Sequence, residues 1–269
     1  MRLPCLAASA VAAVVLPFLA LAAPVSTAVP VTAPFSRVES RGDFDVQIRE
    51  GSPASVEIVA EPDLAARVQA EFKDDTLSLT RSSSWDSATG VVVKVVLPEF
   101  RALAVGGSGK GTVESGPAPR DVKLAVSGSG GITWTGVAAS LEAAVSGSGG
   151  LRATGPSSKL SVAVSGSGSA SVTGDTGDAR VAISGSGSAR LSGKGESLTV
   201  SVGGSGGVDA KGFPVRDASV SVAGSGDVDL RLAGGTVNAQ IAGSGNVTWW
   251  GQGKTGSVST AGSGRIRQR

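Results

Sequence analysis

Apolar and polar residues alternate along the chain from about residue 103, and the alternating pattern recurs every 19 to 21 residues. A period of two is typical of a β-strand with one buried face. A Gly-Ser-Gly motif marks each recurrence. Its nine copies begin at Gly107, Gly128, Gly147, Gly166, Gly185, Gly204, Gly224, Gly243 and Gly262. A spacing held this closely over eight intervals predicts a stack of equivalent units rather than a set of unrelated strands.

Each unit is predicted to be a strand, a Gly-Ser-Gly corner, a shorter strand, a second glycine corner and a variable loop. In one repeat the inward positions are Leu124 and Val126 before the motif and Ile132 and Trp134 after it, while Thr133 faces out. Such a unit cannot bury its apolar face alone, but stacked coils form parallel sheets about 4.8 Å apart around a shared core. We therefore expect an all-β fold. Residues 106–269 should form a single-chain parallel β-helix, or solenoid, of about nine 19–21-residue coils, with a right-handed coil as the expected form.

The Gly-Ser-Gly motif is best interpreted as structural. Glycine adopts positive φ without steric cost and so allows a sharp corner. A serine hydroxyl both donates and accepts, so the motif serines, such as Ser108, Ser129 and Ser148, are expected to form a hydrogen-bonded ladder between coils. A catalytic serine is the weaker interpretation.

Residues 35–105 lack the motif but still alternate, chiefly in 44–48, 55–59, 76–79 and 91–97. One stretch breaks this pattern: in residues 62–72, Leu64, Val68 and Phe72 lie four apart after Pro62, which predicts a short amphipathic helix. Residues 82–90 are expected to form a polar loop. Residues 35–105 are thus predicted to be a β-rich segment with one short helix.

The start of the chain predicts export. Arg2 precedes an apolar run from Leu6 to Leu21, and Ala20 and Ala22 are small residues at the positions a signal peptidase recognises. We expect a signal peptide in residues 1–22, with cleavage as late as residue 28 as the alternative, and a linker in 23–34. A transmembrane anchor is the competing interpretation, but Pro17 interrupts a run that is short for a spanning helix. The mature chain is therefore expected to lack a transmembrane anchor and to be periplasmic or associated with the cell surface.

Composition narrows the chemistry. The chain has no histidine, and its one cysteine, Cys5, lies within the predicted signal peptide. No cofactor, disulfide or transition-metal site is expected. With 24 basic and 22 acidic residues and no dense basic run, nucleic acid is not an expected partner either. A calcium nonapeptide motif resembles residues 224–230 but does not recur, and no phosphate-loop lysine follows any Gly-Ser-Gly.

A family resemblance rests on four strings in the N-terminal segment: residues 35–38, 42–48 (Gly-Asp-Phe-Asp-Val-Gln-Ile) with Gly51, 56–58 (Val-Glu-Ile) and 74–79 (Asp-Asp-Thr-Leu-Ser-Leu). Followed by Leu97-Pro98 and the Gly-Ser-Gly repeats, they resemble the family called putative auto-transporter adhesin, head GIN domain, from about residue 35 to the C-terminus. This resemblance implies a secreted or periplasmic β-helical domain and no particular activity. No translocator barrel is expected from the residues after the repeats, which departs from the auto-transporter part of the description.

The candidate site lies at outward positions of the later repeats. Asp209 and Asp229 are expected at the same position one coil apart, near Lys211 and Arg231, and Trp250 is expected to face out beside Thr248. An exposed tryptophan next to hydroxyl groups could stack on a sugar ring. The competing interpretations are surface charge that keeps the rod soluble and a tryptophan packed under the loop 252–255.

Three functions remain open from sequence. The first is a non-enzymatic binding, adhesion or scaffold module of the cell envelope, possessing a face for polysaccharide or protein. The second is a polysaccharide-cleaving enzyme that uses Asp209 and Asp229, because glycan cleavage on β-helices needs clustered carboxylates. The third is a structural protein that self-associates.

Overall fold

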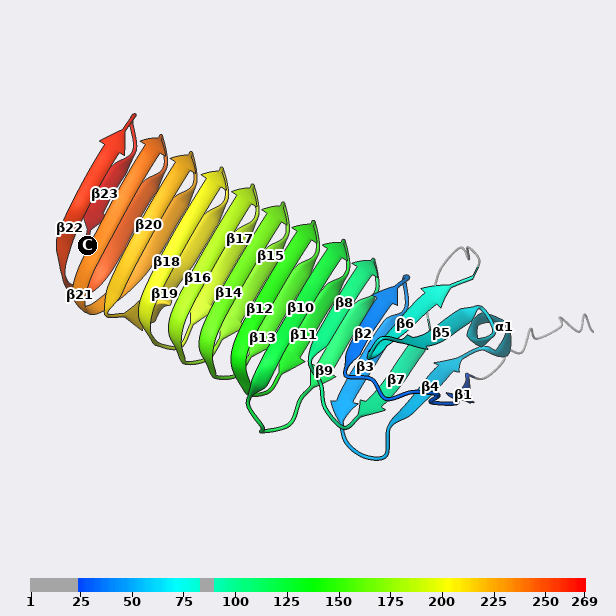
Figure 1. The fold of residues 1–269 in the computed structure, drawn as a ribbon. Helices are drawn as coiled ribbons and strands as arrows, with labels where there is room; N and C mark the ends of the chain where they lie inside the picture. The colour runs from blue at the N-terminus through cyan, green and yellow to red at the C-terminus, as the bar shows by residue number, and fades with distance from the viewer. Residues whose placement is uncertain (1–23, 83–89) are drawn as a thin grey trace, which may run out of the picture.

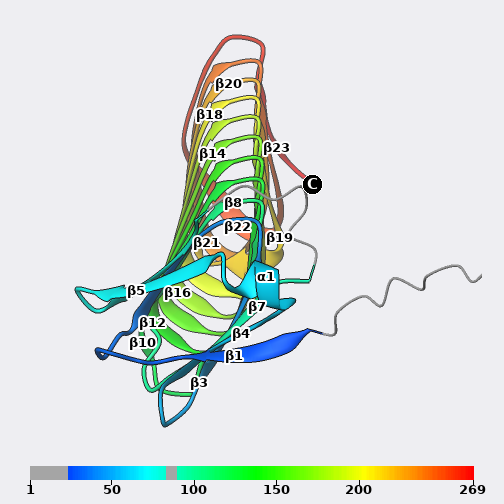
Figure 2. The same cartoon turned by 90° about the vertical axis from the view of Figure 1, so that its right-hand side faces the viewer.

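The computed structural model describes residues 24–82 and 90–269. The predicted signal peptide and nearly all of the predicted 82–90 loop lie outside these residues. The described chain is a rod of stacked β-coils of about nine turns with one short helix, which confirms the predicted fold class. Figure 1 shows the coils following one another along the rod, and Figure 2 shows their narrow cross-section. Within the described ranges, no helix is both long and apolar enough to cross a membrane.

The repeat region consists of long strands alternating with short ones, and each strand pairs in parallel with its equivalent in the next coil. The strands are β8 (Ala102–Gly107), β9 (Lys110–Glu114), β10 (Arg120–Gly128), β11 (Gly131–Thr135), β12 (Ala138–Gly147), β13 (Gly150–Thr154), β14 (Ser157–Gly166), β15 (Ser169–Thr173), β16 (Thr176–Gly185), β17 (Ser188–Ser192), β18 (Gly195–Gly204), β19 (Gly207–Val215), β20 (Asp217–Gly224), β21 (Asp227–Gly243), β22 (Asn246–Ala261) and β23 (Arg265–Gln268).

The core follows the predicted alternation. Leu124, Val126, Ile132 and Trp134 are each at most 2% exposed, and their equivalents are buried in the same way as far as Trp249, whereas Val258 in the last coil is exposed. Because facing residues of neighbouring coils are in register, as Val145 is with Val126, the same side-chain type stacks along the rod. The result is one narrow core of valine, alanine and leucine with polar residues outside.

The Gly-Ser-Gly corners are held by the backbone. The N–H groups of Ser129 and Gly130 both donate to the carbonyl of Gly107 in the preceding coil, at 3.0 and 2.8 Å. The first glycine of every copy has φ between 100° and 131°. The third glycine has no room for a side chain: a Cβ on Gly187 would lie 2.7 Å from the carbonyl oxygen of Gly168.

The predicted ladder of serine hydroxyls differs from what the structure shows. The motif serines are exposed, and among the described residues no hydrogen bond joins one of their hydroxyls to another. The corner does not need the hydroxyls, because the carbonyl of the first glycine already accepts one or two backbone N–H groups from the next coil.

The N-terminal part continues the stack in a different order from the chain. Its strands are β1 (Val25–Val29), β2 (Arg37–Arg41), β3 (Asp45–Glu50), β4 (Ser55–Ala60), β5 (Val68–Lys73), β6 (Thr76–Arg81) and β7 (Val92–Leu97), with α1 (Pro62–Ala65). β2 pairs in parallel with both β6 and β8, and β3 pairs in parallel with both β7 and β9. The coil of β2 and β3, which comes first in the chain, therefore lies between the coil of β6 and β7 and the coil of β8 and β9. Residues 98–101, which connect β7 to β8, must pass this first coil.

Antiparallel strands complete this end of the rod. β5 pairs with β6, and β1 and β4 extend from β7. Residues 25–29, expected to be linker, instead form β1. The predicted helix is shorter than expected: it ends at Ala65, and Val68–Lys73 is strand β5. The reason is a tight turn at Asp74 and Asp75, both with positive φ, which folds β5 back onto β6.

Candidate functional site

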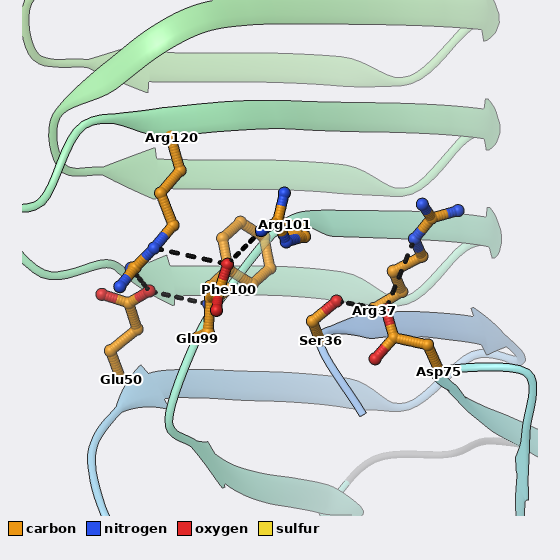
Figure 3. Close-up of polar contacts among 8 residues, drawn as sticks. All are labelled: Ser36, Arg37, Glu50, Asp75, Glu99, Phe100, Arg101 and Arg120. Atoms are coloured by element: carbon orange, nitrogen blue, oxygen red, sulfur yellow. Dashed lines mark hydrogen bonds and ion pairs between the residues drawn. The ribbon is translucent and has the colours of Figure 1, made fainter. Parts of the chain in front are cut away.

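Two clusters of charged side chains differ in burial. The first, the junction cluster of Glu50, Glu99, Arg101 and Arg120, lies where residues 98–101 pass the first coil (Figure 3). The Glu50 side chain is only 10% exposed. Its carboxylate accepts hydrogen bonds from the N–H of Phe100 at 2.7 Å, from Arg120 Nη1 at 2.8 Å and from the N–H of Gly116.

The junction cluster has the contacts of a structural site. Both Glu50 oxygens accept hydrogen bonds, with donors from the crossing segment 98–101, from the β9–β10 connection and from the first residue of β10, and Arg120 also reaches Glu99 at 3.5 Å. A largely buried carboxylate that already accepts three hydrogen bonds has the contacts of a structural group rather than of a ligand site. Glu50 instead holds residues 98–101, the segment that passes the first coil. Phe100 of this segment is 1% exposed and lies in the core.

The second cluster, the Lys211 cluster, lies on the outer side of the short strands and contains the residues predicted from sequence. We define it as Arg190, Asp209, Lys211, Asp229, Arg231 and Trp250. As predicted, Asp209 and Asp229 are in register on β19 and β21. Asp229 is in turn in register with Thr248, and Arg231 with Trp250. The structure thus brings all five predicted site residues, Trp250, Thr248, Asp209, Asp229 and Arg231, to one face.

A bulge in β19 determines where Lys211 lies. The pairing of β19 with both neighbours shifts at this point, and Lys211 and Gly212 are both exposed, which interrupts the alternation. The buried ring of Phe213 follows in the core. The bulge adds one residue to β19 relative to β17. This extra residue accounts for the single 20-residue interval between motifs, from Gly204 to Gly224.

Lys211 lies between two carboxylates. Its Nζ is 2.8 Å from Asp229 Oδ2 and 3.6 Å from Asp209 Oδ1, and Asp209 also pairs with Arg190 at 3.3 Å. The hydrogen bond to Asp229 raises the pKa of Lys211 above its ordinary value of 10.5, with smaller contributions from the charges of Asp229 and Asp209. Arg231 Nε donates to the backbone carbonyl of Lys211 at 3.1 Å.

Trp250 is half-buried and points outward, whereas Trp249 is in the core. Lys211 Nζ lies 5.7 Å from the centroid of the Trp250 ring, within the range of a cation–π contact. The ring is therefore held beside the two aspartates, and Thr248, also half-buried, lies on the same face. Aromatic, hydroxyl and charged groups converge here on an otherwise repetitive surface.

This arrangement does not present the paired carboxyl groups of a glycoside hydrolase. Those enzymes hold two carboxyl groups apart across the space that the sugar bond occupies. Here the ammonium of Lys211 fills the space between Asp209 and Asp229. Within residues 24–82 and 90–269, no group of three or more histidine, cysteine, aspartate or glutamate side chains could hold a metal ion.

The sequence resemblance can now be compared with known proteins. The family model described as putative auto-transporter adhesin, head GIN domain, matches residues 34–174 and 157–253. The chain belongs to this family. The match spans the N-terminal part and most of the repeats, including the Lys211 cluster. A comparison with curated proteins finds no match.

Solved structures with the same fold come from Parabacteroides. A putative adhesin from Parabacteroides distasonis ATCC 8503 is 23% identical, with a TM-score of 0.69 over 92% of this chain and 98% of that one. A putative adhesin from Parabacteroides merdae ATCC 43184 is 20% identical, with a TM-score of 0.71 over 92% and 96%. A putative lipid binding protein from Parabacteroides distasonis ATCC 8503 is 19% identical, with a TM-score of 0.70 over 92% and 97%. At these identities the likeness establishes the fold.

Proposed function

We propose that this protein is an exported, non-enzymatic binding module of the cell envelope that holds a polysaccharide against the Lys211 cluster. The adhesin description of the family supports a binding role. The observation that carries the proposal is Trp250, an outward aromatic ring beside Thr248, Lys211 and Asp229. Rings of this kind stack on the apolar face of a sugar while neighbouring polar groups bind its hydroxyls.

Other ligand classes have less support. One relative is described as lipid-binding, but the large hydrophobic side chains exposed in the described part of this chain are Val25 and Val258, which lie far apart in the sequence. A lipid surface calls for a contiguous apolar patch. Cleavage of glycans is disfavoured by the position of Lys211 between the two aspartates.

The test is glycan binding by the mature chain and by Trp250→Ala and Trp250→Phe. The probes are soluble β-glucan, chitin oligosaccharides, peptidoglycan fragments and polygalacturonate, and binding is measured by calorimetry. We expect at least one probe to bind, with Trp250→Ala about tenfold weaker and Trp250→Phe close to wild type, because stacking needs a ring. Binding that is indifferent to Trp250→Ala, or no binding to any probe, contradicts the proposal.

A chromatographic assay on the same samples tests the enzymatic alternative. We expect the length of every glycan to remain unchanged after incubation. Shortening that disappears in Asp229→Ala would assign catalysis to the cluster instead.

A further inference from the structure

The outer side of the short strands is hollowed along the rod. Three depressions of about 360, 560 and 380 Å³ follow one another from Ser108 to Arg269. The first two share Arg152, and the second and third share Asp227 and Asp229. They therefore adjoin one another along the rod, and together we call them the short-strand groove.

In the middle of the groove the floor is a row of small residues, and the same row carries Lys110 at one end and Asp227, Asn246 and Arg265 at the other. Gly131, Gly150, Ser169, Ser188 and Gly207 occupy the same register position on successive short strands. The adjacent outward row is taller and carries Thr133, Arg152, Ser171, Arg190 and Asp209. A linear polymer can lie on this floor along the rod axis, beside side chains that recur once per coil.

The charge of the groove distinguishes it from the rest of the molecule. Seven cationic side chains line it (Lys110, Arg152, Arg190, Lys211, Arg265, Arg267 and Arg269), against three aspartates (Asp209, Asp227 and Asp229). The lining thus has a net charge of +4, although the whole chain has only +2. The depression on the long strands, in contrast, is balanced, with Glu142 and Asp178 against Lys159 and Arg180.

Several of these cations are available to a ligand. Arg152, Arg265, Arg267 and Arg269 are exposed, and among the described residues none of the four forms an ion pair with a carboxylate. The alternation places Arg265 and Arg267 on the outer side of β23, with Ile266 facing in. Arginine binds carboxylate, sulfate and phosphate groups with two parallel hydrogen bonds.

We propose that the short-strand groove binds a linear acidic polysaccharide, whose chain lies along the rod and whose anionic groups meet Arg152, Arg265 and Arg267. This rests on the proposed function and names its ligand class. The serine and threonine hydroxyls between the arginines suit sugar hydroxyls. A single-stranded nucleic acid would instead call for a series of stacking aromatic rings, whereas among the described residues the aromatic ring found beside the groove is that of Trp250.

The experiment compares acidic polymers with their neutralised forms. The probes are polygalacturonate, alginate and hyaluronate, each alongside the same polymer with its carboxylates methyl-esterified. The proteins are the mature chain, a groove variant (Arg152→Gln, Arg265→Gln, Arg267→Gln) and a control variant (Lys94→Gln, Lys159→Gln, Arg180→Gln). The control removes three exposed cations that form no ion pair among the described residues and lie outside the groove.

We expect at least one acidic polymer to bind at least about tenfold more tightly than its ester, with affinity falling as salt rises. The groove variant should lose about tenfold in affinity and part of the salt dependence, while the control variant changes less than about twofold. Equal affinity for acid and ester, equal loss in both variants, or equal binding of single-stranded DNA overturns the inference.

The two proposals fail differently. Glycan binding that is weakened by Trp250→Ala but shows no preference for acidic polymers removes the acidic ligand and leaves the proposed function. The absence of binding to every polymer, acidic or neutral, removes both.

Discussion

The repeat coils and the N-terminal coils solve the same stacking problem in different ways. From β8 onward, each strand pairs with its equivalent in the next coil, so chain order and stack order agree. In the N-terminal part, the coil of β2 and β3 lies between two coils that follow it in the chain. Local register is enough for the first arrangement, whereas the second needs contacts that occur only once, such as those of Glu50.

The two charged clusters show the same contrast. The Glu50 side chain is 10% exposed and accepts hydrogen bonds from residues far away in the sequence. Asp209 and Asp229 are each 33% exposed, and their partner Lys211 is 45% exposed. Because solvent weakens exposed ion pairs, the first cluster should contribute to stability and the second to binding.

The largest stability effect is expected from Glu50→Ala. This change leaves Arg120 with only its longer contact to Glu99 and the N–H groups of Phe100 and Gly116 without the acceptor they have in the wild type. We expect the free energy of unfolding to fall by about 3 kcal/mol in denaturant titrations. The control is Glu114→Ala, whose pair with Arg49 is exposed and should cost less than about 1 kcal/mol. Equal effects of the two changes would remove the distinction between buried junction and surface pair.

A smaller loss is expected in the regular coils from Gly187→Ala. The added methyl group would lie 2.5 Å from Val164 Cγ1 and 2.7 Å from the carbonyl oxygen of Gly168. Such overpacking should lower the free energy of unfolding by about 2 kcal/mol. Gly150→Ala is the matched control, since the nearest atom to its Cβ is 3.7 Å away. A stable Gly187→Ala variant would show that the corner tolerates a side chain.

The smallest expected effect is the dependence of stability on pH through the pKa of Lys211. Because its pKa is raised in the folded state, its contribution to stability is fully present below the ordinary value of 10.5 and is lost as pH rises through the folded pKa. NMR titration of labelled Lys211 should show a pKa above the ordinary value of 10.5. Asp229→Asn should lower the pKa of Lys211, because the largest cause of the increase is removed, and a wild-type Lys211 that titrates at its ordinary value contradicts the ion pair.

The sequence predicted the repeat coils well because their pattern is local. The inward positions around Val126 and Trp134 follow from alternation alone. The stretch 62–72 misleads because Val68 and Phe72 fit two periods: with Leu64 they are spaced as in a helix, and with Ala70 they alternate as in a strand. Because Val68–Lys73 pairs with β6, these residues form a strand. Phe72 then packs against Phe35, with 5.4 Å between the ring centroids. The crossing held by Glu50 could not be predicted, because its partners lie 50 to 70 residues away.

The candidate site was partly predictable for the same reason. Register placed Asp209 opposite Asp229, and alternation placed Trp250 outside. The bulge that exposes both Lys211 and Gly212 breaks the alternation, so the position of Lys211 between two carboxylates required the structure. The net charge of the short-strand groove also required the structure, since Arg152 on β13 and Arg265 on β23 share one face only through the stacking of the strands between them.

The central claim is that stability and binding reside in separate regions, and measuring both properties on the same two variants tests it most directly. Thermal unfolding and binding of an acidic polysaccharide are recorded for Glu50→Ala and for Trp250→Ala. We expect Glu50→Ala to lower the unfolding midpoint without changing the affinity of the folded protein. Trp250→Ala should weaken binding about tenfold with little change in the midpoint. If Trp250→Ala lowers the midpoint as much as Glu50→Ala and leaves binding unchanged, the Lys211 cluster is part of the scaffold and the account is wrong.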